Sequence, residues 1–130
     1  MAKKSFDVIV PHNHKVRPAE LEAAGILANY YETTVRVLPQ AKGFKEHSAD
    51  FVIDGETYEL KSPITSSVRS INNLIQLATK QSRNVVIDIR KSKITEKKMV
   101  AICNERLKTL KKIKKIVLIV NKKIVLEFNK

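Results

Sequence analysis

An Asp-Gly pair between two runs of β-forming residues is the feature that most constrains the fold of this chain. Asp54 and Gly55 separate the segments 49–53 and 56–61, which are rich in β-forming residues. A type I′ turn requires positive φ at both of its central residues, and Asp-Gly is one of the pairs that adopt it most readily. The sequence therefore predicts a β-hairpin that closes at Asp54 and Gly55.

The turn also fixes which residues face each other across the hairpin. Counting outward gives the pairs Ile53 with Glu56, Val52 with Thr57, Phe51 with Tyr58, and Asp50 with Glu59. Side chains alternate between the two faces of a strand. One face is therefore expected to carry Asp50, Glu59 and Lys61, and the other to carry the core residues Phe51, Ile53, Tyr58 and Leu60.

Two carboxylates are thus expected side by side, with a lysine on the same face. Directly opposed Cβ atoms lie roughly 4.5–5.5 Å apart, so Asp50 and Glu59 would repel each other. A divalent cation between them would remove this repulsion, and carboxylate oxygens suit Mg²⁺ or Mn²⁺ better than Zn²⁺. The Lys61 ammonium would orient a water molecule or offset charge on a phosphate. An ordinary ion-pair cluster on a solvated strand has the same sequence.

The charge balance indicates a polyanionic partner. The chain has 25 Lys and Arg against 13 Asp and Glu in 130 residues, a net charge of +12. Nucleic acid is the first expectation, although an acidic protein would be attracted by the same field. With no Trp and only 5% aromatic residues, a row of base-stacking platforms is not expected.

Length and hydropathy predict one soluble α/β domain that spans residues 1–130. No apolar run is long enough to cross a membrane, and the short run at 8–10 before Pro11 is too short for a signal-peptide core. The single cysteine, Cys103, excludes an internal disulfide and is expected to be a buried small hydrophobe.

Periodicity places further elements around the hairpin. Strands are expected at 5–10, 33–38, 84–89, 116–120 and 124–128, and helices at 19–31, from an N-cap at 65–67 to Lys80, and from an N-cap at Thr95 to about Leu110. The first helix is expected to bury Leu21, Ala24, Leu27, Ala28 and Tyr31, and the second to bury Val68, Ile71, Leu74, Ile75 and Ala78.

Several polar residues outside the hairpin are candidates for a site. Glu20, in the first turn of the first helix, would reach a site at the sheet or simply benefit from the helix dipole. Arg69 and Lys80 lie on the polar face of the second helix, where they would contact phosphate and sugar oxygens or only solvent. The basic run 108–115 either extends a phosphate-binding surface or forms a solvated helix end.

The order of elements and the positions of the acids resemble a known superfamily. Helix, strand, two hairpin strands, helix and strand give an αβββαβ core with an added helix and hairpin, with Asp50 on the second strand and Glu59-Leu60-Lys61 on the third. This is similar to the PD-(D/E)xK (restriction-endonuclease-like) nucleases, although Ala49 stands where the superfamily has proline.

A narrower resemblance covers roughly Pro18 to Ile89. Ala49-Asp50, Glu59-Leu60-Lys61-Ser62-Pro63, Lys80-Gln81-Ser82 and Asn84-Val85-Val86-Ile87-Asp88 look like the C-terminal nuclease domains of bacterial contact-dependent growth inhibition (CdiA-type) toxins. The resemblance implies that Asp50 and Glu59 bind the metal, that Lys61 is the catalytic lysine and that Glu20 is an additional acid. Gln81 matches a glutamine of related domains.

The resemblance also implies a substrate and a partner. It points to tRNA, with DNA as the second choice, and to cleavage in the cytoplasm of a target bacterium. A dedicated immunity protein, expected to be acidic, would neutralise the domain, which is otherwise expected to be a monomer.

Two other functions fit the same residues. A non-catalytic nucleic-acid-binding protein would bind in a salt-sensitive manner that chelator does not affect. A metal-independent ribonuclease would use His12, His14 or His47 as general acid or base and would cut in chelator. The His12 and His14 pair also fits zinc ligands or solvated residues of a basic loop.

Overall fold

The computed structural model of the chain describes residues 7–12, 16–39 and 49–130. The elements, in chain order, are β1 (Val8–Ile9), α1 (Pro18–Tyr31), β2 (Val35–Val37), β3 (Phe51–Ile53), β4 (Glu56–Lys61), α2 (Val68–Ala78), β5 (Asn84–Asp88), α3 (Glu96–Thr109), β6 (Lys115–Ile119) and β7 (Val125–Asn129). The predicted order of elements is confirmed within these residues.

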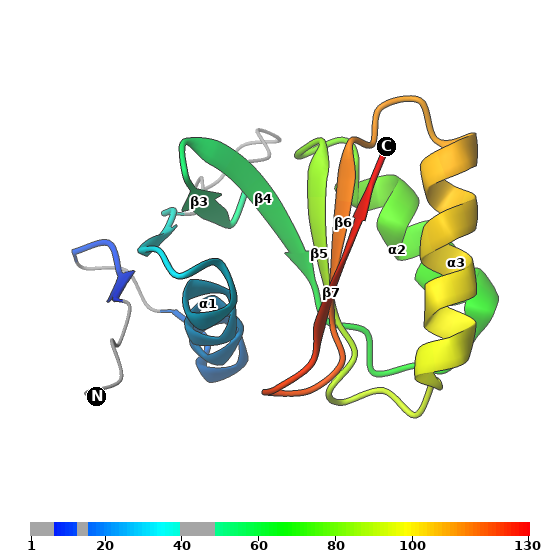
Figure 1. Ribbon diagram of the computed structural model, residues 1–130, viewed down its shortest axis with the longest axis horizontal. Coiled ribbons are helices and arrows are strands. Elements are labelled where there is room, and N and C mark those ends of the chain that lie inside the picture. Colours follow the sequence, from blue (N-terminus) through cyan, green and yellow to red (C-terminus); the bar gives the residue numbers. More distant parts are fainter. Residues whose placement is uncertain (1–6, 13–15, 40–48) are drawn as a thin grey trace.

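The strands form one mixed sheet between two layers of helix. Their spatial order follows the sequence from β1 to β7, with parallel pairing for β1–β2, β4–β5 and β5–β6 and antiparallel pairing elsewhere. α1 covers one face and α2 with α3 covers the other (Figure 1). Strand β5 is buried along its whole length, as its apolar sequence predicts for a strand covered on both faces.

The hairpin that organises the sequence forms as predicted. Asp54 and Gly55 both have positive φ, 50° and 80°, as a type I′ turn requires. Three of the four predicted pairs are present in the β3–β4 ladder: Phe51 with Tyr58, Val52 with Thr57, and Ile53 with Glu56. Phe51, Ile53 and Tyr58 are buried against α1, as expected for the core face.

Local signals in the sequence set the helix ends. The Ser67 and Thr95 side chains accept hydrogen bonds from the backbone N–H groups of Ser70 and Lys98, which caps α2 and α3. Pro18 occupies the first turn of α1, where its missing N–H has no helical partner to lose. Burial raises the pKa of the Cys103 thiol to about 12, which agrees with its predicted role as a buried hydrophobe.

The buried stripe of α1 differs from the predicted one. Glu20, Ala23, Ala24 and Leu27 are buried at spacings of three, four and seven residues, whereas Leu21 is 43% exposed. At 100° per residue, Leu21 lies about a quarter turn from the centre of this stripe. The prediction erred because it placed the apolar Leu21 in the core and left the charged Glu20 outside it.

Other boundaries shift by small amounts. β1 is shorter than the predicted strand, α2 ends at Ala78 rather than Lys80, and Val68, the first residue of α2, is exposed. Among the described helices, none is both long and apolar enough to cross a membrane.

Candidate active site

Asp50 lies just before β3 and is held by hydrogen bonds of both its backbone and its side chain. Its N–H donates to the Tyr58 carbonyl (2.9 Å), its carbonyl accepts from the Leu38 N–H (2.8 Å), and its Oδ2 accepts from the Leu60 N–H (2.7 Å). The ladder ends at Phe51 and Tyr58, so the predicted backbone pair of Asp50 with Glu59 is absent. The reason is local: the Asp50 N–H donates to the carbonyl of Tyr58, the residue before Glu59, and this shift prevents the pair.

Glu59 still lies beside Asp50 through its side chain. Only 4% of Glu59 is exposed, and its Oε2 lies 3.3 Å from the Lys61 Nζ. Burial and then the charge of Asp50 raise the pKa of Glu59 to about 8, although the charge of Lys61 acts in the opposite direction. The expected crowding of two carboxylates next to a lysine is therefore present in the fold.

The Glu59 carboxylate also has an unused acceptor. Its Oε1 is buried and has no hydrogen-bond partner among the described residues. Buried polar atoms without a partner are uncommon in folded proteins. This oxygen is therefore available to bind a cation or a hydrogen-bond donor of a ligand.

Glu20 and Lys61 line a common cleft at the end of the sheet where β4 stops. The cleft has a volume of about 600 Å³ and is lined by Arg17, Pro18, Ala19, Glu20, Leu60, Lys61, Ser62, Ile64 and Lys91. Glu20 is buried and its Oε2 lies 4.0 Å from the exposed Arg17. Ligands in α/β proteins commonly bind beyond the carboxyl ends of parallel strands, which is where this cleft lies.

The described residues do not contain a complete cluster of metal ligands. No group of three or more His, Cys, Asp or Glu in 7–12, 16–39 and 49–130 is placed to hold one ion. Glu20 faces the cleft with Lys61, whereas Asp50 and Glu59 are not among the residues that line it. Among the described residues, Asp50 and Glu59 are the two predicted metal ligands that lie beside each other.

The other predicted site residues are spread along α2 and the turn after it. Arg69 and Lys80 are exposed near the two ends of the helix, and Gln81 is half-buried in the turn that leads to β5. Lys80 lines a hollow of about 290 Å³ with Asn73, Gln76 and Leu77. Of the three histidines, His12 is exposed, whereas His14 and His47 lie outside the described residues.

Arg90 was not predicted from the sequence and fixes the start of α1. Its guanidinium donates to both Asp88 oxygens (Nε to Oδ1 2.9 Å, Nη2 to Oδ2 2.8 Å), to Glu22 (3.2 Å) and to the Ala19 carbonyl (3.4 Å). Asp88 ends the buried strand β5 and is itself 4% exposed. This cluster of contacts, the Arg90 clamp, therefore ties the first turn of α1, which carries Glu20, to the end of β5.

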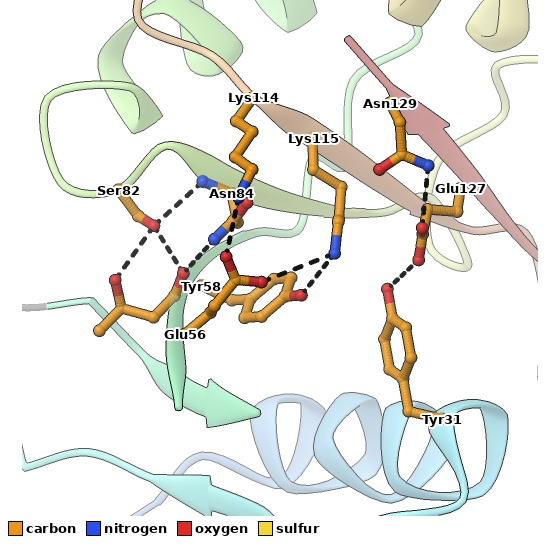
Figure 2. A network of polar contacts seen from close by, with 10 residues as sticks. Tyr31, Glu56, Tyr58, Ser82, Asn84, Lys114, Lys115, Glu127 and Asn129 are labelled. Atoms are coloured by element: carbon orange, nitrogen blue, oxygen red, sulfur yellow. Dashed lines mark hydrogen bonds and ion pairs between the residues drawn. The ribbon is translucent and has the colours of Figure 1, made fainter. Parts of the chain in front are cut away.

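A second polar network lies near the other end of α1 (Figure 2). The Lys115 Nζ donates to the Tyr58 hydroxyl (3.0 Å) and lies 3.8 Å from Glu56, while the Tyr31 hydroxyl donates to Glu127. Burial lowers the pKa of Lys115, but the hydrogen bond to Tyr58 and the nearby charges outweigh it and raise the pKa overall. These contacts join α1, β4, β6 and β7, which are far apart in the sequence.

A family profile matches more than half of the chain. The profile describes the contact-dependent growth inhibition CdiA C-terminal domain, and it matches residues 46–125. The chain belongs to this family. The matched residues of this CdiA C-terminal domain include Asp50, Glu59 and Lys61 and extend through β6 into β7.

The fold of the CdiA C-terminal domain also matches a solved structure. A chain of the CdiA-CT/CdiI toxin and immunity complex from Burkholderia pseudomallei superposes with a TM-score of 0.72 and 20% sequence identity. The match covers 95% of this chain and 99% of that one. At this identity the likeness establishes a shared fold. No curated protein matches the sequence.

Proposed function

We propose that this CdiA C-terminal domain is a toxin nuclease that hydrolyses phosphodiester bonds in RNA with the help of a divalent metal ion. The Asp50, Glu59 and Lys61 constellation carries the proposal. It combines a buried carboxylate of raised pKa, a second carboxylate beside it and an ammonium 3.3 Å away, at the edge of a cleft. Strongly perturbed acids next to a cleft are typical of catalytic sites.

The residues present fit a divalent cation. Asp50 and Glu59 supply carboxylate oxygens, which suit Mg²⁺ and Mn²⁺, and the Glu59 Oε1, which has no hydrogen-bond partner in the described part of the chain, offers one donor directly. A cation at this pair would neutralise the repulsion that raises the pKa of Glu59. When bound, such an ion supplies a water of lowered pKa and a positive charge near the phosphate.

The remaining steps fall to side chains of the chain itself. Lys61 would donate a hydrogen bond to a non-bridging oxygen of the scissile phosphate and so offset the charge that builds there. Glu20, which lines the same cleft, would accept a hydrogen bond from the attacking water. Arg17 and Lys91 line the cleft and would bind the flanking phosphates.

RNA is the proposed substrate class, with tRNA as the target and DNA as the second choice. The charge of +12 favours contacts to the phosphate backbone, and the low aromatic content disfavours a stacking platform. Backbone contacts suit a folded RNA that is recognised by its shape. Arg69, Lys80 and Gln81 would add contacts along α2, and the choice of tRNA follows from the resemblance to growth inhibition toxins.

The test is cleavage of total tRNA and of plasmid DNA by the purified domain. Each substrate is incubated with Mg²⁺, Mn²⁺ or Zn²⁺ and with chelator, beside the variants Asp50→Asn and Lys61→Ala. The control is Lys122→Ala, which removes an exposed lysine in the β6–β7 turn. We expect Mg²⁺- or Mn²⁺-dependent cutting of tRNA that falls by a factor of about 100 or more in both variants, the usual scale for lost electrostatic stabilisation.

Thermal unfolding measures metal binding independently of cleavage. Mn²⁺ should raise the Tm of the wild-type protein, because a ligand that binds only the folded state stabilises it by about 2.7 kcal/mol at 100 times its Kd. Glu59→Gln should abolish this rise. Cutting that persists in chelator would instead favour a histidine-dependent ribonuclease, and intact binding without cutting would favour the non-catalytic function.

The same proposal includes a protein partner and a place of action. The matched solved structure is a toxin and immunity complex, and a charge of +12 suits an acidic inhibitor. We therefore expect an acidic immunity protein to bind this domain, which would act in the cytoplasm of a target cell and be a monomer when unbound.

A further inference from the structure

Five cations surround a hollow at the end of the sheet where β5 and β6 begin. The hollow has a volume of about 420 Å³ and is lined by Arg83, Lys111, Lys112, Ile113, Lys114 and Lys130. We call it the basic hollow. Its residues stand before β5, before β6 and at the end of β7, so it lies at the opposite end of the strands from the cleft that contains Lys61. The starts of β5 and β6 and the C-terminus are at the top of Figure 1.

The cations come from three segments that the fold holds together. The Lys114 N–H donates to the Arg83 carbonyl (2.8 Å), which joins the turn before β5 to the turn before β6. The Lys130 N–H donates to the Lys114 carbonyl (3.0 Å), and the Lys130 Nζ donates to the Leu110 carbonyl (2.7 Å). The backbone of the basic hollow is therefore fixed by the fold before any ligand binds.

Little negative charge balances these cations. The described residues that line the basic hollow include no Asp or Glu. The Lys114 Nζ does pair with Glu56 at 3.1 Å (Figure 2), but both side chains are well exposed, so the pair is weak. Like charges gathered in this way repel each other, and an anion in the hollow would remove the repulsion.

We propose that the basic hollow is an exosite that binds the phosphate backbone of the RNA substrate away from the point of cleavage. This inference rests on the proposed function for the choice of RNA. A protein interface of comparable strength would need an exposed apolar or aromatic centre. The single apolar residue of the lining, Ile113, is 1% exposed, so the ligand meets charged side chains only.

The spacing between the two sites suits a folded RNA. Lys61 pairs with Ile87, four residues along the chain from Arg83, which corresponds to roughly 13 Å along the strands. Successive phosphates of one DNA strand rise about 3.4 Å along the axis, and the more compact A-form helix of RNA rises less, so this separation corresponds to a few base pairs of duplex. One RNA can therefore contact the basic hollow and the cleft at once.

The test measures binding apart from cleavage. Fluorescence anisotropy with labelled tRNA is recorded in chelator on the Lys61→Ala protein, with and without Lys111→Gln/Lys112→Gln. The matched control is Lys97→Gln/Lys98→Gln, which removes the same charge from exposed positions at the start of α3. Each lost phosphate contact lowers the slope of log affinity against log salt concentration by roughly 0.7, so two lost contacts lower it by roughly 1.4. If the two proteins bind equally at about 1 M salt, the hollow variant should bind about 25-fold more weakly at about 0.1 M.

The outcomes separate this proposal from the proposed function. A loss of affinity and of salt slope in the hollow variant, with the control within threefold of the parent, supports the exosite even if the wild-type protein cuts nothing. Equal affinities in the two variants overturn it, even if the wild-type protein cuts tRNA, and would assign the charges to another polyanionic partner. Arg83→Gln provides an independent variant should Lys111→Gln/Lys112→Gln fail to reach the parent's Tm.

Discussion

Glu59 is the residue whose environment departs most from that of an ordinary surface acid. It is buried, lies beside Asp50 and keeps one oxygen without a hydrogen-bond partner among the described residues. An isolated charged carboxylate buried in this way would lower the free energy of unfolding unless other interactions compensated for its lost hydration. Stability and metal affinity should therefore both depend on whether this carboxyl is charged.

The stability of the folded chain should fall as pH rises through the range set by Glu59. The pKa of Glu59 is about 8 in the folded state against 4.5 ordinarily, so between these values the folded state keeps a proton that the unfolded state has lost. The free energy of unfolding should decrease by up to about 5 kcal/mol across this range, since one pKa unit corresponds to about 1.4 kcal/mol, and should level off above it. Urea denaturation at pH 5, 7 and 9 measures the change.

The variant Glu59→Gln isolates this effect, because a neutral amide does not titrate. This variant should lose most of the pH-dependent decrease in the free energy of unfolding. It should also be more stable than the wild-type protein at pH 9. Glu105→Gln, at an exposed position of α3, should leave the decrease in place. A wild-type stability that rises between pH 5 and pH 9 would contradict the raised pKa.

At the scale of elements, the two described glycines test how backbone conformation supports the hairpin and the helix. Gly55 has a φ of +80° in the turn, and a methyl group added to either Gly25 or Gly55 would meet no atom within 4 Å. Steric clash should therefore not contribute to the change in stability caused by an alanine at either position. Any difference between them reports on the backbone alone.

Gly55→Ala and Gly25→Ala should change stability in opposite directions. Alanine at a positive φ costs roughly 1–2 kcal/mol, so Gly55→Ala should lower the free energy of unfolding. Gly25 lies within α1, where alanine is favoured by up to about 1 kcal/mol over glycine. Thermal unfolding of the two variants tests the pair, and a destabilised Gly25→Ala would show that α1 packs too closely there to accept a methyl group.

The Arg90 clamp should be needed both for the stability of the domain and for the position of the first turn of α1. Arg90→Ala leaves the buried Asp88 carboxylate without its guanidinium, and breaking a buried pair of this kind costs about 3–5 kcal/mol. Cleavage should also fall, because Glu20 lies in the helical turn that Arg90 holds. Denaturant unfolding measures the first effect and tRNA cleavage the second.

A double variant separates charge from packing at this clamp. Asp88→Asn/Arg90→Leu removes both charges and should recover part of the stability that Arg90→Ala loses, while leaving cleavage low. If the double variant is less stable than Arg90→Ala, the interaction is dominated by packing and not by an unpaired charge.

At the scale of elements, the sequence predicted which segments form helices and strands but not every face they bury. The hairpin register could be predicted because an Asp-Gly turn restricts its neighbours to one alignment. The stripe of α1 could not, because Glu20 and Leu21 are adjacent and hydrophobicity alone favours Leu21. Glu20 was predicted either to reach a site at the sheet or to benefit from the helix dipole, and neither alternative placed it in the buried stripe with Ala23, Ala24 and Leu27.

At the scale of the whole molecule, the charge of +12 is spread over both ends of the sheet. Arg17, Lys61 and Lys91 line the cleft, and five cations line the basic hollow. Mutual repulsion of this kind destabilises the compact state. Ionic strength should therefore affect the folded protein even without RNA.

Raising KCl from 0.1 M to 1 M should increase the Tm by several degrees. Over this range the screening length falls from about 10 Å to about 3 Å, which weakens repulsion between exposed charges. A variant that replaces Lys97, Lys98, Lys122 and Lys123 with Gln has a charge of 12 − 4 = +8 and should gain less from the salt. A Tm that falls with KCl would show that attractive ion pairs outweigh the repulsion.

The hairpin, the order of the elements, the helix caps and the likeness to CdiA-type domains follow from the sequence alone, because each is carried by short segments of the chain. Three-dimensional packing was needed to bury Glu20 beside the cleft, to bring Arg90 to the start of α1, and to bring Arg83, Lys114 and Lys130 together around one hollow. These features join segments tens of residues apart. Their positions depend on how the sheet pairs and how the helices pack on it, and local patterns do not encode either.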